Sequence, residues 1–469
     1  MGLQRNDDET AQREVPGDAP TGAYGLEPIV VTMSNVNRDP ESQSQAQSMG
    51  GDIESKASAW ICVLGSFLFL VPSFVTDATI LGSGFMQSLG TVQSYLSINQ
   101  LKDYSEGEVG WISGMFLFLS LVFNLQVGPL FDVHGPNIIG PIGTALYVAM
   151  FLFMAECKTY WQFMLCLGVF GSIGAATTMV VAVAVVGKLF VRRRGLAMGI
   201  ALAGSSAGSV LFPIILRYTF PALGWQWSMR IMAFVCAGVL IPGTICFLPF
   251  NKLHGITSDG QPRPKSSALN LAAFKSPAFN FVTAGLFMLE FSIFSIAGLL
   301  PSISTRAGFT PEEGYILLAI VGSASCFGRI IPGFIGDRVG HFNMLLISMV
   351  FTIIFMVVMF IPFGTSSAPV LYAFSAIWGF GSGSFLSITP VCMGKTCEAK
   401  DYGRFYGTMN FVVSFALLIA LPTSGSMLDT MGAQALAGLL TATVFIGGAC
   451  YFAARALLIG KWLSPRTKI

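Results

Sequence analysis

The sequence predicts an all-α integral membrane protein with twelve transmembrane helices in two six-helix bundles. Hydrophobic residues make up 53% of the 469 residues and charged residues only 11%, less than half of the roughly 25% charged share of a soluble domain. The apolar residues gather in blocks of about 20 or more, the length that a helix needs to cross a bilayer. A polar motif also occurs once in each half of the chain.

The repeated motif has the pattern G-x-x-x-D-x-x-G. Its first copy contains Gly128, Asp132 and Gly135, and its second copy contains Gly333, Asp337 and Gly340. Each residue of the second copy lies 205 positions after its counterpart (128 to 333, 132 to 337, 135 to 340). A repeat of this length indicates two similar halves that present the same tight turn.

The chain begins with a polar segment, residues 1–56, which is rich in Gln, Ser, Asn, Asp and Glu. Such a segment buries too little surface to offset its ordering entropy, so a disordered cytoplasmic tail is expected. The first bundle is predicted over residues 57–249. Its six spans cover residues 57–96, 109–131, 137–155, 161–187, 196–219 and 229–249.

A polar linker that contains prolines, residues 250–276, separates the two halves and is expected on the cytoplasmic side. The second bundle is predicted over residues 277–463, followed by a short cytoplasmic tail at 464–469. Its six spans cover residues 277–303, 314–336, 342–363, 368–392, 404–428 and 434–459. Six spans, a linker and six spans agree with the repeat.

The first apolar block is about twice the length that a span needs, and it contains Asp77. The block is either one long broken helix or a span of normal length with an insertion at residues 75–83. The insertion is favoured, because a charge that faces lipid is expensive.

Orientation follows from the distribution of Lys and Arg, which favours cytoplasmic segments. With a cytoplasmic N-terminus, 17 of these residues fall on the inside and 5 on the outside. Both termini are therefore expected in the cytoplasm, in a multi-pass protein of the plasma membrane.

The sequence predicts neither an enzyme nor a metalloprotein. The three histidines are not close to cysteines at ligand spacing, so no metal site and no cofactor are expected. The phosphate-binding loop of a primary pump is absent from the sequence. The expected partners are a small-molecule solute and the lipid bilayer, with protons as a candidate coupling ion. Nucleic acid is not expected as a partner, and the functional unit is expected to be a monomer.

The repeated turn is predicted to form a latch between the cytoplasmic ends of the two bundles. A carboxylate at a helix end can accept hydrogen bonds from the N-terminus of a neighbouring helix or from an arginine. Candidate partners are the basic turn with Arg192, Arg193 and Arg194, and the region around Arg404. The three arginines are equally well explained as a topology signal. The second copy includes Arg338, so the firmer latch is expected there.

These features resemble the major facilitator superfamily over about residues 57–460. Two segments, residues 131–136 and 190–201, are similar to the monocarboxylate porter family in its fungal branch, and residues 224–231 fit that branch. The resemblance implies a secondary transporter in which two six-helix bundles rock around a site near the middle of the membrane.

The sequence departs from the animal members of that family at two positions. Their span 1 lysine corresponds to Gln87, and their span 8 aspartate corresponds to Ser325, although the arginine four residues later is kept as Arg329. The resemblance therefore does not imply proton-coupled lactate transport by the same residues.

Two ionisable residues lie inside predicted spans, where charges are rare and usually functional. Arg329 is the candidate to bind an organic anion, with pairing to a helix end as the alternative. Glu290 is the candidate for proton coupling, with a polar contact between helices or a position in a wet cavity as alternatives. Gln87 and Trp378 rank next, because the resemblance places spans 1, 4, 7 and 10 around the cavity. Asn410 is a further candidate ligand.

The predicted cargo is a small organic solute, most simply an anion. Efflux of a secondary metabolite is favoured over the alternative, proton-coupled uptake of a monocarboxylate or vitamin, because the lactate-type residues are missing. An alternative of another class is a membrane sensor of the same fold that does not transport.

Overall fold

The computed structural model describes most of the helical part of the chain. The described residues are 54–72, 96, 99–104, 106–257, 271–306, 308, 311–363, 367–461 and 467. Gln87 and the proposed insertion at residues 75–83 lie outside them.

The described part of the chain consists of helices and their connections, without a strand. The first half contains α2 (Ala57–Leu70), α4 (Glu106–His134), α5 (Pro136–Glu156), α6 (Tyr160–Phe163), η1 (Met164–Gly171), α7 (Ser172–Leu189), α8 (Arg194–Cys246) and α9 (Phe250–Thr257). The second half contains η2 (Leu271–Lys275), α10 (Pro277–Arg306), α11 (Pro311–Val339), α12 (His341–Phe355), η3 (Met356–Phe360), α13 (Ile361–Phe363), α14 (Ala368–Met393), η4 (Ala399–Asp401), α15 (Tyr402–Thr430) and α16 (Ala433–Ile459). The predicted all-α class is confirmed.

Ten helices among the described residues are long and apolar enough to cross a membrane. The other two predicted spans correspond to α2, a shorter apolar helix, and to the first part of α8. The 53 residues of α8 are interrupted at Gly224, whose φ of 70° is not helical. This break separates the predicted spans five and six, and an L-residue with a side chain rarely adopts a positive φ.

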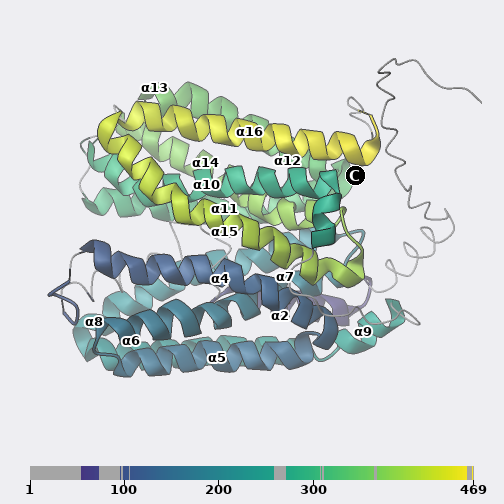
Figure 1. Cartoon of the computed structure of the whole chain (residues 1–469), viewed down its shortest axis with the longest axis horizontal. Coiled ribbons are helices and arrows are strands. Elements are labelled where there is room, and N and C mark those ends of the chain that lie inside the picture. Colours follow the sequence, from purple (N-terminus) through teal and green to yellow (C-terminus); the bar gives the residue numbers. More distant parts are fainter. Residues whose placement is uncertain are drawn as a thin grey trace, which may run out of the picture. The chain divides into compact units, whose positions relative to one another are not determined.

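The helices form two groups that follow the two halves of the sequence (Figure 1). In the first group α8 packs on α2 and α5, and α7 packs on α4 and α5. In the second group α14 packs on α11 and α12, and α10 packs on α15 and α16. The main contacts between the groups are made by α4 with α15 and by α8 with α11. We call these contacts the first seam (α4 and α15) and the second seam (α8 and α11).

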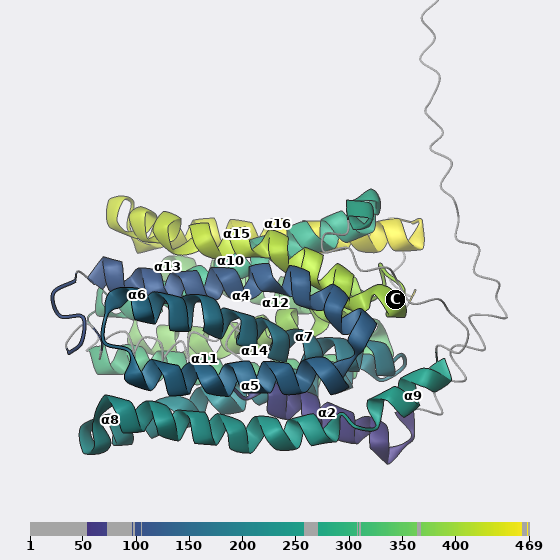
Figure 2. The ribbon, with the colours of Figure 1, turned by 60° about the horizontal axis from the view of Figure 1, so that its bottom comes forward.

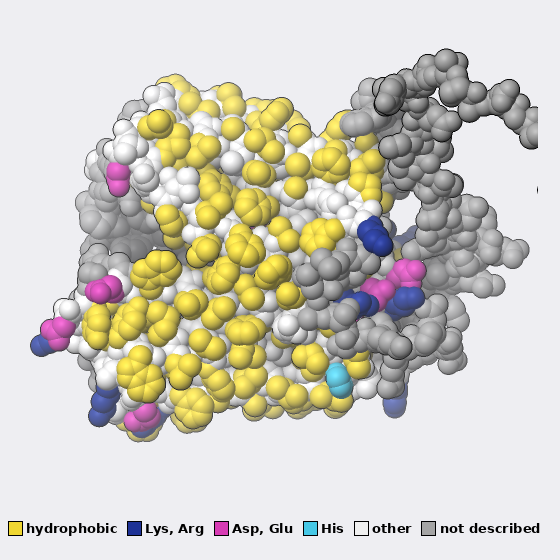
Figure 3. Space-filling model, in the orientation of Figure 1, with side chains coloured by type: hydrophobic (Ala, Val, Ile, Leu, Met, Phe, Trp, Pro, Cys, Tyr) yellow, Lys and Arg dark blue, Asp and Glu magenta, His cyan; other side chains and the backbone are white. Residues whose placement is uncertain are grey.

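The surface between the helix ends is apolar. On the face shown in Figure 3, the described charged side chains gather at the two ends of the helices, with hydrophobic side chains between them. Large hydrophobic residues within the helices, such as Phe234, Ile354 and Phe445, are exposed. In water such a surface would be unfavourable, whereas in a bilayer it faces lipid tails. The chain is therefore built as a multi-pass membrane protein.

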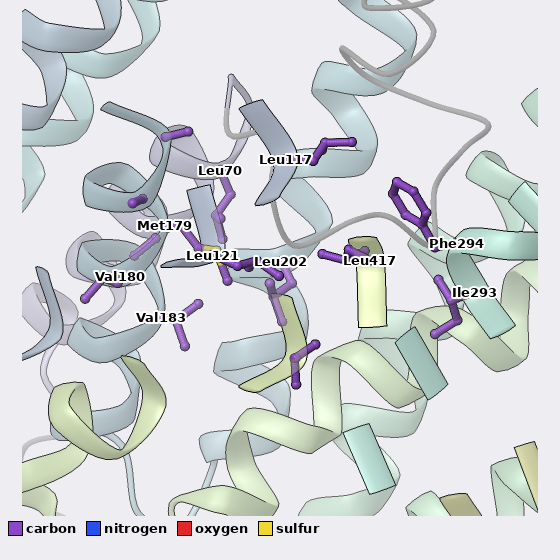
Figure 4. Packing of buried hydrophobic residues seen from close by; sticks show 14 of the residues in the cluster. Leu70, Leu117, Leu121, Met179, Val180, Val183, Leu202, Ile293, Phe294 and Leu417 are labelled. Carbon is purple, nitrogen blue, oxygen red and sulfur yellow. The ribbon is translucent and has the colours of Figure 1, made fainter. Parts of the chain in front are cut away.

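Buried hydrophobic residues form a cluster that continues through both bundles (Figure 4). Leu121, Met179 and Leu202 contribute from the first half, and Phe294 and Leu417 from the second. The two halves therefore meet through packed side chains as well as through polar contacts.

Two segments expected to lack structure are partly ordered. Glu54 belongs to the predicted disordered tail, yet it is only 4% exposed. The first residues of the predicted linker form α9, which contacts α2, α5 and α7 at one end of the first bundle (Figure 2). Local hydrophobic positions explain the linker helix, because Phe250 and Leu253 lie on one face of α9 and are buried.

Candidate functional site

The first copy of the motif joins the two bundles through Asp132. Its carboxylate, near the C-terminal end of α4, accepts hydrogen bonds from the N-terminus of α15. The Gly403 N–H donates to Oδ1 at 3.1 Å and the Arg404 N–H donates to Oδ2 at 2.8 Å. Unpaired N–H groups and the helix dipole make such a terminus a good anion site. We call this contact the first latch.

The second copy of the motif makes the equivalent contact in the opposite direction. Asp337, near the C-terminal end of α11, accepts hydrogen bonds from the N-terminus of α8: from Gly195 at 2.7 Å and from Leu196 at 2.9 Å. The donor residues also repeat, since 195 and 196 precede 403 and 404 by 208 positions, close to the repeat distance of the motif. We call this contact the second latch, and we call the end of the bundles that carries both latches the motif end.

Glycine allows the two seams to close beside the latches. A Cβ atom on Gly128 would overlap the carbonyl oxygen of Gly403, and one on Gly195 would overlap that of Gly333. The last glycines of the motif serve the turns instead. Gly135 has a φ of 73° and Gly340 a φ of 104°, values that favour glycine.

The two latches differ in their cations. In the first latch, Lys188 Nζ lies 2.8 Å from Asp132 Oδ1, and both side chains are at most 3% exposed. In the second latch, His341 Nε2 lies 2.9 Å from Asp337 Oδ1. Lysine carries its charge throughout the physiological pH range, whereas histidine can be neutral there. The first latch therefore contains a buried lysine–aspartate pair, and the second a histidine–aspartate pair.

This difference changes the ranking expected from the sequence. Arg338 was predicted to make the second latch the firmer one, but its guanidinium lies over the ring of Phe334, 4.3 Å from the centroid. A helix directs neighbouring side chains to different faces, so Arg338 points away from the face that Asp337 uses.

The arginines of the basic turn have separate roles. Arg194 is buried, donates a hydrogen bond to the Gly187 carbonyl, and lies over the ring of Tyr402 in the other bundle, 5.2 Å from the centroid. It therefore contributes a third contact between the bundles at the motif end. Burial and the positive charge of Arg194 lower the pKa of Lys395 nearby. Arg192 and Arg193 contribute backbone N–H groups, which donate hydrogen bonds to Glu54.

Glu54 holds that backbone in place. Its carboxylate accepts hydrogen bonds from the N–H groups of Val191 and Arg192, each at 2.6 Å, and of Arg193 at 3.1 Å. These residues lead directly into the α8 terminus that Asp337 binds. Sequence reasoning missed this contact, and the available signal was an acidic residue just before the first apolar block.

Arg329 lies two helical turns deeper than Asp337 in the second seam. Its side chain is fully buried and reaches from α11 into α8, where Nη1 donates to the Leu202 carbonyl and to Ser205 Oγ. The backbones are close here as well, because a Cβ atom on Gly199 would overlap the Arg329 carbonyl. Arg329 therefore ties the two bundles together from within the membrane.

The first seam carries amides at the corresponding depth. Asn124 precedes Arg329 by the repeat distance of 205 residues, and Asn410 follows Leu202 by 208. Both side chains are buried, and Asn124 Nδ2 lies 3.7 Å from the Met179 sulfur. Asn410 continues the face of α15 that begins with Gly403 and meets α4. At this depth the second seam thus contains a guanidinium, and the first seam contains neutral amides.

Glu290 is buried in α10 and is directed into the second bundle. It is close enough to the Tyr451 hydroxyl on α16 to interact with it electrostatically. That hydroxyl lies 2.9 Å from Thr389 Oγ1 on α14. Glu290 therefore belongs to a polar group formed by α10, α14 and α16.

Trp378 is buried on the face of α14 that meets α12 and η3. Its ring stacks on Phe374, with centroids 6.2 Å apart, and Phe374 stacks on Phe360 at 4.2 Å. Gly381, on the same face, has Thr352 as its neighbour. The structure thus places Trp378 in the packing of the second bundle rather than beside Arg329 on the second seam.

Comparison with known proteins identifies the family. The family model described as Major Facilitator Superfamily matches residues 57–421. The chain is 30% identical to the riboflavin transporter MCH5 of Saccharomyces cerevisiae, over 92% of this chain and 84% of that protein. It is 31% identical to the fujikurins efflux protein of Gibberella fujikuroi, over 89% and 86% of the two chains. The aspyridones efflux protein apdF of Emericella nidulans is 29% identical, over 86% and 78%.

Solved structures show the same fold. The human organic anion transporter MFSD10 (TETRAN) matches with a TM-score of 0.61 at 15% identity, over 84% of this chain and 98% of that chain. A bacterial homologue of the iron transporter ferroportin, in an outward-facing state, matches with a TM-score of 0.64 at 12% identity, over 86% and 100%.

Proposed function

Because this chain belongs to the Major Facilitator Superfamily and transports a small organic solute across a membrane, we propose that its cargo is an organic anion that Arg329 binds. The proposed direction is export of a secondary metabolite from the cell. Two of the relatives named above are efflux proteins, for fujikurins and for aspyridones, and they support this direction. The riboflavin transporter among them favours the second candidate, uptake of a vitamin or monocarboxylate.

The position of Arg329 carries the proposal. A fully buried guanidinium that leaves its own bundle and enters the other is costly unless its partners are strong. Its partner Leu202 is a carbonyl within a helix, which also serves the hydrogen bonding of that helix. A carboxylate is a stronger partner for a guanidinium than a carbonyl is. An anion that reaches Arg329 therefore displaces α8 and loosens the second seam.

We further propose that the two latches form the cytoplasmic gate of a transporter in the plasma membrane. Positive residues gather at the motif end, as cytoplasmic segments require. Both latches and the Arg194 contact close the motif end. A path from water to the proposed site would therefore open at the opposite end of the bundles. The two seams lie within one chain, which supports a monomer as the working unit. Membership of the fungal monocarboxylate porter branch is part of the same proposal.

The first experiment compares the metabolites inside and outside cells that have or lack the protein. This comparison identifies the cargo and the direction of its transport. For that cargo, Arg329→Ala is expected to reduce transport by about 30-fold or more, because loss of one partner of a buried charge pair costs about 2–5 kcal/mol. The matched control is Arg230→Ala. Arg230 pairs with the exposed Glu156 at the opposite end of the bundles and should be dispensable. Normal transport by Arg329→Ala, at normal membrane abundance, would remove Arg329 from the site.

Glu290 is proposed as the proton-coupling residue. An amide cannot take up a proton, so Glu290→Gln is expected to lose accumulation driven by a pH gradient while it retains exchange of labelled cargo across the membrane. Both fluxes are measured in vesicles with an imposed pH gradient, and Glu156→Gln is the matched control at an exposed carboxylate. Full pH-driven accumulation by Glu290→Gln would refute the role.

A further inference from the structure

Two cysteines that are far from the motif end lie against each other. Cys157 follows the last residue of α5, and Cys166 lies in η1, the π-helical part of the fourth span. Both lie 3.3 Å from carbonyl oxygens one turn apart on α5, Cys157 Sγ from Phe153 and Cys166 Sγ from Met150. The residue after α5 and a residue of η1 thus bring both sulfur atoms to one turn of α5.

The pair lies in the wall of a cavity at the surface. The cavity has a volume of about 320 Å³, and its wall includes both cysteines together with Glu156, Trp161 and Gln162. Glu156 is exposed and pairs with Arg230, and Trp161 is 63% exposed. An exposed tryptophan beside charged and amide side chains is typical of the level where a bilayer meets water. Cys157 is 9% and Cys166 8% exposed, so the cavity, whose wall also includes Phe153, Leu165 and Phe170, is the place where their thiols can be reached.

We propose that Cys157 and Cys166 form a disulfide in the mature protein. The inference rests on the proposed orientation, which places this end of the bundles in the oxidising space outside the cell or in the secretory lumen. The cysteines at the motif end, among them Cys246, Cys392 and Cys397, then face the reducing cytoplasm and remain thiols.

The positions of the two cysteines suggest the order of the chemical steps. Cys157 lies in the connection after α5, whereas Cys166 lies within η1, so Cys157 is the thiol that reacts first, as its thiolate. This thiolate attacks a disulfide oxidant of the secretory pathway, so that one sulfur of the oxidant becomes bonded to Cys157 and the other leaves as a thiolate. Cys166 then gives up its proton and attacks the Cys157 sulfur. The second oxidant sulfur leaves, and two thiols of the oxidant have been formed for one new disulfide.

The disulfide would fix the register of η1. A π-helical segment has one residue more per turn than an α-helix, so its conversion to α-helix would rotate Cys166 by about 100° around the axis. A bond from Cys166 to the end of α5 prevents this rotation. Gly171, the last residue of η1, lies against Met150 on α5, so the same register also sets the packing of the fourth span.

The experiment uses the full-length protein from membranes that were prepared without reductant. Denatured protein is treated with N-ethylmaleimide and divided into two samples. One sample is digested without reduction for mass spectrometry, and the other is reduced, labelled with a second maleimide and then digested. The expected result is a linked pair of peptides with two hydrogen atoms fewer than the thiol forms, and the second label on Cys157 and Cys166 only. Reduction is expected to lower the melting temperature by a few degrees. The double variant Cys157→Ser/Cys166→Ser should not respond to reductant.

A reporter cysteine tests the orientation of the protein independently of the disulfide. Lys158→Cys, made in the double serine variant, places an exposed thiol beside the site. A membrane-impermeant maleimide on intact cells should label it. If the reporter is labelled from outside while Cys157 and Cys166 carry the first maleimide, the disulfide is refuted and the orientation stands. If the reporter is labelled only in permeabilised cells, both the orientation and the disulfide are refuted. Cys246→Ser, at the motif end, is the control that should leave the linked peptides unchanged.

Discussion

Asp132→Asn is expected to abolish transport and to lower the free energy of unfolding by about 3 kcal/mol, the usual cost of breaking a buried ion pair from one side. The amide keeps the size of the carboxylate but leaves the charge of Lys188 buried without its partner. It also offers Gly403 and Arg404 a weaker acceptor at the α15 terminus. Melting of the purified protein and flux of its cargo are the two measurements.

Asp337→Asn is the matched comparison, because it removes the same charge from the repeated position. A smaller loss of stability is expected, since a neutral His341 can remain beside the amide without an unpaired charge. The double variant Asp132→Asn/Lys188→Met should recover much of the stability that Asp132→Asn loses, because the orphaned charge is gone. A larger loss for Asp337→Asn, or no recovery in the double variant, would contradict the asymmetry of the latches.

Gly199→Ala is expected to prevent closure of the motif end and to reduce transport by at least about tenfold. The added methyl group would overlap the carbonyl oxygen of Arg329, which belongs to the backbone and cannot rotate away as a side chain would. The α8 and α11 backbones would have to separate, and both Asp337 and Arg329 reach across that seam. The state of the gate is measured by the rate at which a cysteine placed at the motif end reacts with maleimide.

Gly238→Ala, in the part of α8 that follows the break at Gly224, is the control. A methyl group at Gly238 meets no atom within 4 Å, and alanine favours a helix over glycine by about 1 kcal/mol. This variant should transport normally, with equal or higher stability. Equal transport by the two variants would show that close contact of the backbones at Gly199 is unnecessary.

The sequence was sufficient for the architecture because the architecture repeats. The spacing between Asp132 and Asp337 predicted two matching halves, and the family and the helical fold agree with it. The regions around Gly195 and Arg404 were also predicted as partners of the two aspartates. The atoms involved were not predicted: the aspartates bind backbone N–H groups, which point out of the helix terminus and are left unpaired within the helix.

Other features were beyond the reach of sequence patterns for physical reasons. Glu54 binds a turn more than 130 residues later, and no local signal specifies such a partner. Trp378 was ranked as a ligand because the resemblance places span 10 at the cavity, and the position of a helix does not show which of its faces meets the cavity. The contact of Cys157 with Cys166 depends on a π-helical turn, which changes the direction of every side chain after it.

The two latches have a kinetic consequence, because they connect the same two bodies in parallel. Neither can be released alone to open the gate, so their free energies add in the activation barrier for opening. Hydrogen bonds to charged groups are worth about 1.5–3 kcal/mol each, and each latch has two of them. A tenfold change in rate corresponds to about 1.4 kcal/mol. For the proposed gate, we therefore expect the turnover rate of the transporter to depend on these two aspartates as well as on the cargo.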